Sequence, residues 1–486
     1  MKAKQFILSG FFIVILFLIV YMSIFFYQLG APLKSEYWIQ HSYQYKDYKA
    51  KSLDSKKIII ISGSNSLFGI NSKTIQEKIG YPVINLAVHA GLDIDFLYYK
   101  LQQNISQGDI VVMPLEFGQY SRSEKFSKWF YNGMMTWGID YLKSLSYKDF
   151  LKFILNSEPS RILEGSIKQF ESNSTNSKVL SEKEVIDSLN KLWEGDGVKW
   201  RGYSYKSLNK LGDINADKSV VYNENLNYLS GSIQVSKHFL NIYNKINSLV
   251  KDNNGTLFLT YPVTIKNTKF DLSKKESQKR IKNLELSLNK HNIDIYCNAA
   301  LFNLERVYFF NTHYHPNKYG ALIRSENLAE CLNDVINGKN TKLSYDEAII
   351  KVKKLEDKYI DLVKKSNFYI RLKDLKEIKK ALKLYYAKNG DYPKSKGFDG
   401  FYTKWGQSGE LWITGLVPLY LKSLPRDPRK SENKGEQYLY KSNGKDYKLI
   451  AHAPEDCKKV KKTNPNLIDK RDCWAYGFWT EGAKNW

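Results

Sequence analysis

Two short polar stretches of the chain carry the residue types of nucleophilic catalysis. Ser64 lies in SGSNS (62–66), directly after four consecutive isoleucines. His313 and His315 lie in FFNTHYHPNKYG (309–320) and are two of only seven histidines in the chain. A serine becomes a nucleophile when a neighbouring base, most often histidine, takes its hydroxyl proton. The two stretches therefore raise the hypothesis of a serine nucleophile that a histidine activates.

Each stretch also has a plain structural interpretation. Ser64 or Ser66 is suited to capping a helix that begins there, because short hydroxyl side chains accept the first N–H groups of a helix. His313 and His315 fit an ordinary surface loop or an H-x-H metal pair. No third ligand follows at the spacing of a metal site, so we predict no metal.

Apolar runs that alternate with helical patterns predict a parallel sheet with helices on both faces. Helices are predicted at 74–80 and 94–106. Strands are predicted at 58–62, 81–88, 108–115, 256–263 and 293–298. In such α/β folds, ligands bind beyond the carboxyl ends of the strands. SGSNS is expected at that edge, where the following helix offers unsatisfied N–H groups.

Three blocks in this order resemble the SGNH/GDSL-type hydrolases and the related membrane-tethered O-acyltransferases. SGSNSLFGI resembles their first block, NLAVHAG (85–91) the second and HPNKYG (315–320) the last. The resemblance implies a flavodoxin-like SGNH domain over residues 56–340. It also implies a helical insertion at about 120–236, which either selects substrate as a lid or caps one edge of the sheet.

Carried onto this chain residue by residue, the resemblance makes Ser64 the nucleophile and His315 the general base and then acid. The N–H groups of Ser64 and Gly91 are implied as oxyanion donors, with Asn85 in the same second block. No cofactor is expected for this chemistry. The acceptor decides the reaction, since water gives an esterase and a sugar hydroxyl gives an O-acyltransferase.

The chain departs from this family in the residue that should orient the histidine. The family has an aspartate two or three positions before its histidine, where this chain has His313 and Thr312. Asn311 is the nearest residue able to orient the ring, although an amide stabilises imidazolium less than a carboxylate does. Glu116 is an alternative acid to orient the histidine, and a Ser–His dyad without an acid is another solution. Asn65 and His313 are predicted to support the site.

The N-terminus predicts a membrane anchor. Residues 6–27 carry no charge and are long enough to span a bilayer as a helix. Lys2 and Lys4 precede them, which predicts a short cytoplasmic tip at 1–5 with the bulk of the chain outside. We therefore expect a single-pass protein of a bacterial inner membrane that faces the periplasm, with a tether at 28–55. A cleaved signal peptide is the alternative.

The last third of the chain is predicted to form a separate small α+β domain. A helical linker is expected at 345–366, within a long charged helix from Tyr345 to about residue 388. Within residues 367–486, ALKLYYAKNGDYP, GLVPLYL, LPRDP and YLYKSNGKDYKL resemble the globular head of type II secretion major pseudopilins. The resemblance implies a binding or docking module and raises calcium in the loop before the last strands, without a matched ligand set. No hydrophobic assembly helix precedes this head, so filament assembly is not expected.

The net charge limits the classes of partner that we expect, and the cysteines indicate the redox compartment. The net charge of +24 favours anionic partners, such as an anionic glycan or cell-envelope polysaccharide, although a lysine-rich solvated surface explains it equally well. No nucleic-acid motif is present, so no nucleic acid is expected. A disulfide between Cys457 and Cys473 is predicted for an oxidising compartment, while Cys297 and Cys331 either pair with each other or stay reduced.

Two hypotheses of function follow. The first is acyl transfer on a cell-envelope polysaccharide, with a multi-span membrane acyltransferase as the donor partner that the resemblance implies. The second is a catalytically lapsed SGNH scaffold with a pilin-like head, serving as a glycan-binding, assembly or secretion accessory protein.

Overall fold

The computed structural model of the chain forms two compact units. It describes residues 2–33, 36–123, 127–172, 180–216, 226–230, 234–339, 342–431 and 433–486. The first unit comprises Met1–Ile214, Gly231–Pro262 and Lys282–Tyr296. The second comprises Asn215–Ser230, Val263–Ile281 and Cys297–Trp486. Met1 of the predicted tip and parts of the predicted tether and insertion lie outside the described residues.

The first unit begins with two helices. Helix α1 (Lys2–Tyr27) is uninterrupted, and Gln5–Tyr27 has a mean hydropathy of 2.7, so it is long and apolar enough to cross a membrane. Helix α2 (Tyr37–Lys51) follows and buries one face, including Tyr43 and Lys46. Much of the predicted tether is therefore a helix packed on the unit, because residues three or four apart, such as Ile39, Tyr43 and Lys46, face the same side and are buried.

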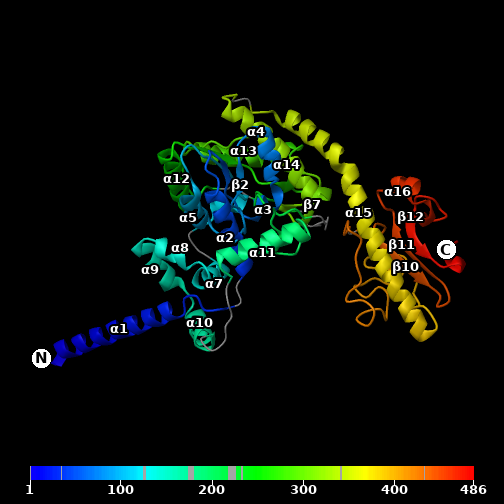
Figure 1. Ribbon diagram of the computed structural model, residues 1–486, viewed down its shortest axis with the longest axis horizontal. Helices are drawn as coiled ribbons and strands as arrows, with labels where there is room; N and C mark the ends of the chain where they lie inside the picture. The colour runs from blue at the N-terminus through cyan, green and yellow to red at the C-terminus, as the bar shows by residue number, and fades with distance from the viewer. Residues whose placement is uncertain are drawn as a thin grey trace. The chain divides into compact units, whose positions relative to one another are not determined.

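A four-stranded parallel sheet forms the centre of the first unit (Figure 1). The strands are β1 (Ile58–Ile60), β2 (Val83–Asn85), β3 (Ile110–Pro114) and β4 (Thr256–Thr260). Their order is β2-β1-β3-β4, and Ile59 of β1 pairs with Ile84 and Val111. The first four predicted strands are confirmed, because continuous apolar runs suit strands that are buried on both faces.

The helices that connect these strands begin and end where the sequence has capping residues. They are α3 (Ser64–Gly69), α4 (Ser72–Ile79), α5 (Ile94–Asn104) and α12 (Lys237–Asp252). Asp93 caps α5 by accepting the Ile94 N–H at 2.7 Å. Gly80 ends α4 with a left-handed φ of 84°, a conformation that glycine adopts without strain.

The predicted fifth strand at 293–298 is wrong. Tyr296 donates one N–H to the Leu259 carbonyl at 2.8 Å, which continues the sheet by a single hydrogen bond. Asn292 and Cys297 have left-handed φ values of 57° and 70°, and these interrupt the extended backbone on both sides. Alternating apolar residues predicted a strand, but the turns at both ends limit the pairing.

Between β3 and α12 the described chain is helical. These helices are α6 (Phe117–Ser121), α7 (Lys128–Thr136), α8 (Ile139–Ser144), α9 (Tyr147–Asn156), α10 (Pro159–Ser172) and α11 (Glu182–Gly195), with the 3-10 turn η1 (Tyr205–Ser207). The insertion at about 120–236 stays a prediction, and its residues 124–126, 173–179, 217–225 and 231–233 lie outside the described chain.

The second unit holds two short strand pairs and the helix that follows the histidine motif. Strand β5 (Thr264–Ile265) pairs with β6 (Asn303–Leu304), and β7 (Phe309–Thr312) pairs with β8 (His315–Pro316). The 3-10 turns η2 (Ala299–Phe302) and η3 (Arg306–Tyr308) precede α14 (Lys318–Ile336). Helix α13 (Lys275–Asn289) runs through the boundary at which the chain passes between the units.

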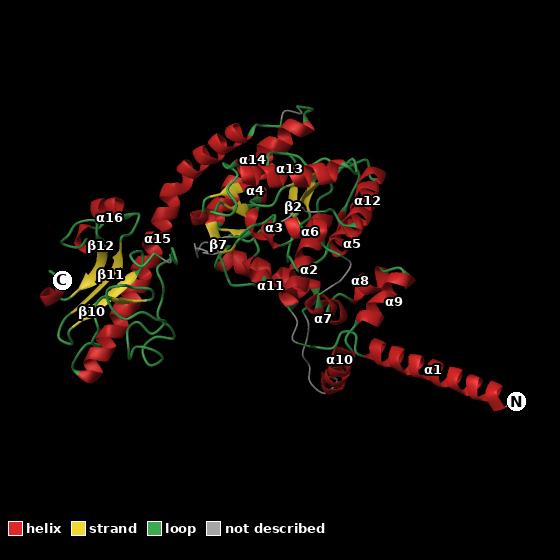
Figure 2. Cartoon of the chain, turned by 180° about the vertical axis from the view of Figure 1, so that it is seen from behind, coloured by secondary structure: helices red, strands yellow, loops and turns green. Residues whose placement is uncertain are grey.

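Helix α15 (Tyr345–Asn389) is continuous, as the sequence predicts. A capping box between Ser344 and Glu347 starts it, and Gly390 with a φ of 77° ends it. Leu375, Ile378 and Leu382 are buried on its C-terminal half. They pack against an antiparallel sheet of order β12-β11-β10-β9 (Figure 2).

The strands of this sheet are β9 (Asp399–Gly400), β10 (Tyr438–Ser442), β11 (Tyr447–His452) and β12 (Ala475–Trp479). Between β11 and β12 lie α16 (Cys457–Thr463) and η4 (Pro465–Leu467), and η5 (Glu481–Ala483) follows β12. A helix packed on an antiparallel sheet is a small α+β arrangement, so this coarse prediction is confirmed.

The disulfide of the described chain joins two cysteines whose pairing the sequence left open. Cys297 and Cys331 form it, and it joins the start of η2 to α14. Cys457 and Cys473 are thiols, so the predicted pair between them is wrong. Burial and the hydrogen bond that the Cys457 S–H donates to Cys473 raise the pKa of Cys457, which keeps the thiol protonated.

Candidate active site

Ser64 is the first residue of α3, at the carboxyl end of β1. Gly63 precedes it as the N-cap, where a Cβ atom would lie 2.9 Å from the Ala90 Cα and would also meet the Glu116 carboxylate. Only glycine fits this turn, which explains the Ser-Gly-Ser sequence. Ser64 is 8% exposed, and its hydroxyl has no hydrogen-bond partner within the described part of the chain.

The other polar residues of the SGSNS turn form a buried hydrogen-bond cluster. Ser62 donates to the Pro114 carbonyl at 2.7 Å, and the Asn65 amide donates to the Ser62 hydroxyl at 2.6 Å and to Pro114 at 3.0 Å. Ser66 donates to the Asn65 carbonyl oxygen at 3.3 Å. These bonds tie the ends of β1 and β3 together, so Asn65 and Ser66 hold the turn in which Ser64 presents its hydroxyl.

Glu116 lies against the same turn. Its Oε1 accepts the Asn65 N–H at 3.2 Å, and its Oε2 is buried without a hydrogen bond to any described residue. A carboxylate is favoured beside the first N–H groups of a helix. Glu116 therefore supports the SGSNS turn, whereas the sequence also raised it as an acid for the histidine.

The two predicted oxyanion donors from the second block are engaged in internal bonds. Gly91 donates its N–H to His89 Nδ1 at 3.0 Å. Asn85 donates its amide to the Ser66 carbonyl at 2.8 Å and to Asp213 at 3.0 Å. Asn85 therefore supports α3 through the Ser66 carbonyl. The Gly91 N–H already has an acceptor, His89 Nδ1.

His89 is a residue of this site that the sequence reasoning missed. Its ring stacks on Trp129 with centroids 4.3 Å apart. Burial lowers the pKa of His89, although Glu36 opposes the shift, so the ring is neutral near pH 7 and Nδ1 is an acceptor. A histidine within NLAVHAG, two residues before the glycine, was the signal that could have identified it.

His315 lies in the second unit, where it begins β8. It is 7% exposed, and its Nδ1 lies 3.0 Å from Asn311 Oδ1 on the neighbouring strand β7. An amide oxygen accepts only, so the Nδ1 of His315 carries the proton and Nε2 is the basic nitrogen. This is the contact that an orienting residue makes, and Asn311 is where the sequence placed one.

The rest of HPNKYG fixes the position of His315. The Asn317 side chain caps α14 by accepting the Tyr319 and Gly320 N–H groups at 3.0 and 3.1 Å. A Cβ on Gly320 would lie 2.8 Å from the Pro316 Cβ, so only glycine fits. The Tyr228 hydroxyl donates a hydrogen bond to the backbone carbonyl of His313 at 2.8 Å, and the His313 ring packs against Tyr314. His313 therefore supports the hairpin loop.

The predicted site residues thus form two organised groups. The first unit brings together Ser64, Asn65, Asn85, Gly91 and Glu116, and the second brings together Asn311, His313 and His315. Their roles in one reaction remain a prediction.

An acidic cluster near the second block has the composition of a cation site. Asp93, Asp95 and His238 place ligand atoms within 4.8 Å of one another. His238 Nε2 lies 2.9 Å from Asp95 Oδ2 and 3.7 Å from Asp93 Oδ1, and Arg122 lies 3.8 Å from Asp93. Although burial favours the neutral ring, the two aspartates raise the pKa of His238 to about 10. The distances between the imidazole and the two carboxylates are those of an ion pair, and we interpret the cluster as one.

A half-open cleft of about 260 Å³ lies between α2, α5, α8 and the start of α11 in the first unit. Aromatic and polar side chains line it: Gln40, Tyr43, Gln44, Asp47, Lys51, Phe96, Tyr99, Lys100, Gln103, Trp137, Asp140, Tyr141 and Glu182. Lys100 binds Asp47 at 2.6 Å and lies 4.8 Å from the centroid of the Tyr43 ring. Aromatic faces beside amides and carboxylates suit a hydroxyl-rich ligand. No sequence pattern pointed to this cleft.

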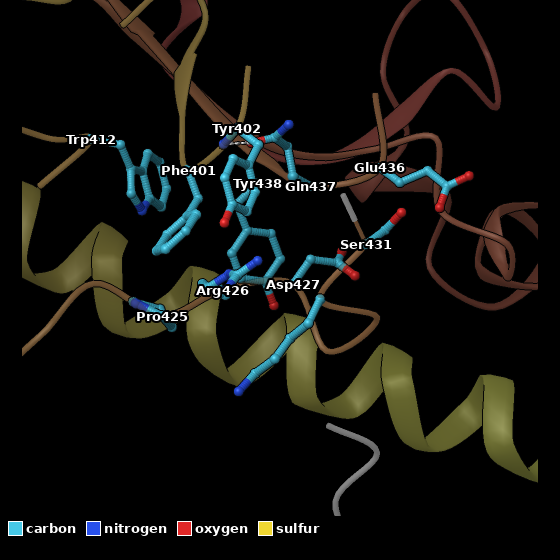
Figure 3. Close-up of a pocket in the computed structure, with 11 residues that line it drawn as sticks. Phe401, Tyr402, Trp412, Pro425, Arg426, Asp427, Ser431, Glu436, Gln437 and Tyr438 are labelled. Carbon is cyan, nitrogen blue, oxygen red and sulfur yellow. Dashed lines mark hydrogen bonds between the residues drawn. The ribbon is translucent and has the colours of Figure 1, made fainter. Parts of the chain in front are cut away.

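The C-terminal sheet carries a smaller cavity, shown in Figure 3. It encloses about 10 Å³ beside Phe401, Trp412 and Tyr438, which is room for no more than about one water molecule. The Arg426 guanidinium lies 3.8 Å from the centroid of the Phe401 ring and closes one side. This cavity therefore does not admit a sugar.

Asp427 beside this cavity, and Glu455 and Asp456 after β11, are paired with arginine, while the calcium that the pseudopilin resemblance raised stays a prediction. Asp427 is bound by Arg371 at 2.9 Å and by Arg429 at 2.8 Å. Although burial opposes ionisation, the two guanidinium groups lower the pKa of Asp427 to about 2. Arg371 also binds Glu455 at 2.6 Å and Asp456 at 3.1 Å. These acids are neutralised by arginine.

A comparison with known protein families finds a match for one part of the chain. Residues 358–466 match the model of the family "Type II secretion system (T2SS), protein G". The match covers the C-terminal half of α15 and most of the α+β module, so the pseudopilin-like domain predicted from the sequence is supported. A search of curated proteins finds no match to the chain.

Proposed function

We propose that this protein transfers acyl groups through Ser64 to a cell-envelope polysaccharide, as an O-acyltransferase or an esterase. The observation that carries the proposal is the Ser64 hydroxyl. It stands unbonded among the described residues, on a glycine-dependent turn between a parallel strand and a helix. Every other hydroxyl and amide of SGSNS is engaged in holding that turn.

In the proposed reaction, the oxygen of Ser64 attacks the acyl carbonyl while His315 Nε2 takes the hydroxyl proton. The tetrahedral intermediate collapses to acyl-Ser64, and His315 returns the proton to the leaving oxygen. A sugar hydroxyl or water then attacks the acyl-serine, and His315 acts as base again. The contact of Nδ1 with Asn311 supports this role, because it directs the basic nitrogen away from the hairpin.

Two rearrangements at the serine turn are part of this proposal. The Gly91 N–H becomes an oxyanion donor only when His89 Nδ1 releases it. The Glu116 carboxylate lies beside the turn where negative charge develops next to Ser64, so displacement of Glu116 favours the reaction. The resting conformation is therefore a closed one, which substrate binding must open.

The proposed location is a bacterial inner membrane, with α1 as a single-pass anchor and the two units in the periplasm. The apolar length of α1 supports the anchor, and the pseudopilin-like match is consistent with the cell envelope. The aromatic and polar cleft between α2 and α5 supports a glycan ligand. A multi-span membrane acyltransferase is proposed as the donor of the acyl group.

The test is covalent labelling of the full chain in detergent with a fluorophosphonate probe. We expect labelling of the wild type, and its loss in Ser64→Ala and His315→Ala. Ser66→Ala is the matched control, since Ser66 lies two residues away with its hydroxyl bound to Asn65. A folded wild type that takes up no probe, or labelling that persists in Ser64→Ala, contradicts the proposal.

The second candidate is a catalytically lapsed scaffold that binds glycan or assists secretion through its pseudopilin-like head. The bonds of Gly91 and Asn85 and the charge of Glu116 favour it, because they leave the predicted oxyanion hole occupied. It predicts a folded protein that binds oligosaccharides and does not react with the probe. Probe labelling that depends on Ser64 would exclude it.

A further inference from the structure

Two helices of the insertion expose apolar side chains in regular stripes. On α9 the exposed side chains are Tyr147, Leu151 and Leu155, each four residues after the last. On α10 they are Leu163, Ile167 and Phe170. Leu155 and Phe170 are 69% and 76% exposed. Such continuous apolar faces mark an interaction surface rather than scattered surface residues.

Both helices pack against the end of the apolar helix α1. The Phe25 ring lies 6.1 Å from the Phe150 ring of α9, and the Tyr21 hydroxyl donates to the Ile154 carbonyl at 3.4 Å. Ile162 of α10 is buried in the same cluster as Phe25. Figures 1 and 2 both show α9 and α10 beside this end of α1. The exposed stripes thus lie on two helices that pack against the end of α1.

The length of α1 sets where the membrane must lie. Its freely exposed apolar part runs from Phe6 to Val20, which at about 1.5 Å per residue is only about 22 Å. The hydrocarbon core of a bilayer is about 30 Å thick. The last turns of α1 must therefore also lie in the membrane, and Ile24 and Phe26 remain exposed there. These turns are the ones that α9 and α10 contact.

We infer that α9 and α10 form a collar around the end of α1 and insert their exposed apolar faces into the outer boundary of the bilayer. The exposed Lys148 lies beside the stripe on α9, as expected for a side chain that reaches the headgroups. The net charge of +24 favours an anionic surface in the same way. The lipid bilayer is the occupant because both striped helices pack against the end of α1, the helix proposed to enter the bilayer, and their exposed faces are apolar like α1.

This inference rests on the proposed anchoring by α1 and is independent of acyl transfer. A collar fixes the first unit against the membrane instead of leaving it on a loose tether. Its cleft and the Ser64 turn then stay at one height above the lipid surface, within reach of a donor embedded in the same membrane.

The test is photo-crosslinking of the full chain in vesicles of phosphatidylethanolamine and phosphatidylglycerol. Benzoylphenylalanine replaces Leu155 or Phe170, with Phe12 in α1 as the positive control. Leu286 on α13, 51% exposed, is the matched negative control. We expect lipid adducts at Phe12, Leu155 and Phe170, several-fold above the yield at Leu286, by mass spectrometry.

The control positions separate the different ways in which the collar could fail. Adducts at Phe12 with only background at Leu155 and Phe170 overturn the collar and leave the anchor standing. Crosslinks from Leu155 or Phe170 to a second copy or another protein also overturn it, since a protein then covers the stripes. Background yield at Phe12 as well overturns the anchoring on which the collar rests. All replaced side chains are exposed, so folding is expected to be unaffected.

Discussion

Replacing Asn311 by aspartate tests the proposed role of His315 directly. Asn311 Oδ1 lies 3.0 Å from His315 Nδ1, so Asn311→Asp places a negative charge at that distance from the ring. Coulomb's law gives about 1.4 kcal/mol of extra stabilisation of imidazolium in a water-like dielectric and about 5.5 kcal/mol at an effective dielectric of 20. Since 1.4 kcal/mol is about tenfold in rate, the step that protonates His315 should accelerate at least about tenfold.

The assay is the rate of fluorophosphonate labelling of Ser64 at a fixed detergent concentration and constant pH. Asn311→Ala removes the acceptor and should slow labelling below the wild type. Asn333→Asp on the exposed face of α14 is the matched control, because it adds the same charge away from the ring and should leave the rate unchanged. A correctly folded Asn311→Asp protein that labels no faster than the wild type refutes the reasoning that His315 gains a proton in the rate-limiting step.

Three further predictions concern charge, pH and the disulfide. Glu116→Gln keeps an acceptor for the Asn65 N–H but removes the charge beside the nucleophile; labelling should rise at least about fivefold, given about 1–4 kcal/mol of repulsion at ~4 Å, and slower labelling would show that the carboxylate is needed. His238 has its pKa raised from 6.5 to about 10, so its stabilisation is complete below pH 6.5 and is lost as pH rises through 10; the wild-type melting temperature should fall over that window more than that of His238→Gln, and parallel curves would contradict the ion pair. The disulfide between Cys297 and Cys331, 34 residues apart, should contribute about 3–4 kcal/mol; the double alanine variant should lose it in urea unfolding, and a loss below about 1 kcal/mol would argue against the bond.

The sequence predicted the elements whose signals are local. Four apolar runs become the four parallel strands, because a strand buried on both faces must be apolar along its length. The long helix α15 follows from a capping box at Ser344 and a glycine at 390, with an apolar stripe between them. The turn at Gly63 and the cap at Asn317 are also readable, since each depends on one residue type that only that backbone geometry requires.

The errors arose where distant parts of the chain decide the outcome. Cysteine spacing predicted a disulfide between Cys457 and Cys473, but both are thiols. The disulfide forms between Cys297 and Cys331, because η2 packs on α14. The segment at 293–298 alternates like a strand, yet the turns on both sides allow it a single sheet hydrogen bond.

The sequence by itself determined the chemistry that is available: a serine on a tight turn, a histidine with an amide four residues before it, an apolar N-terminal helix and a pseudopilin-like C-terminal domain. Only the tertiary structure decided how these groups are engaged. In the folded chain the Gly91 N–H donates to His89, and Glu116 accepts the Asn65 N–H of the serine turn. Helices α9 and α10 pack against the end of α1. The physical reason is that residue types fix which bonds a side chain is able to make, whereas the choice of partner depends on which groups the packed chain brings within hydrogen-bonding or contact distance.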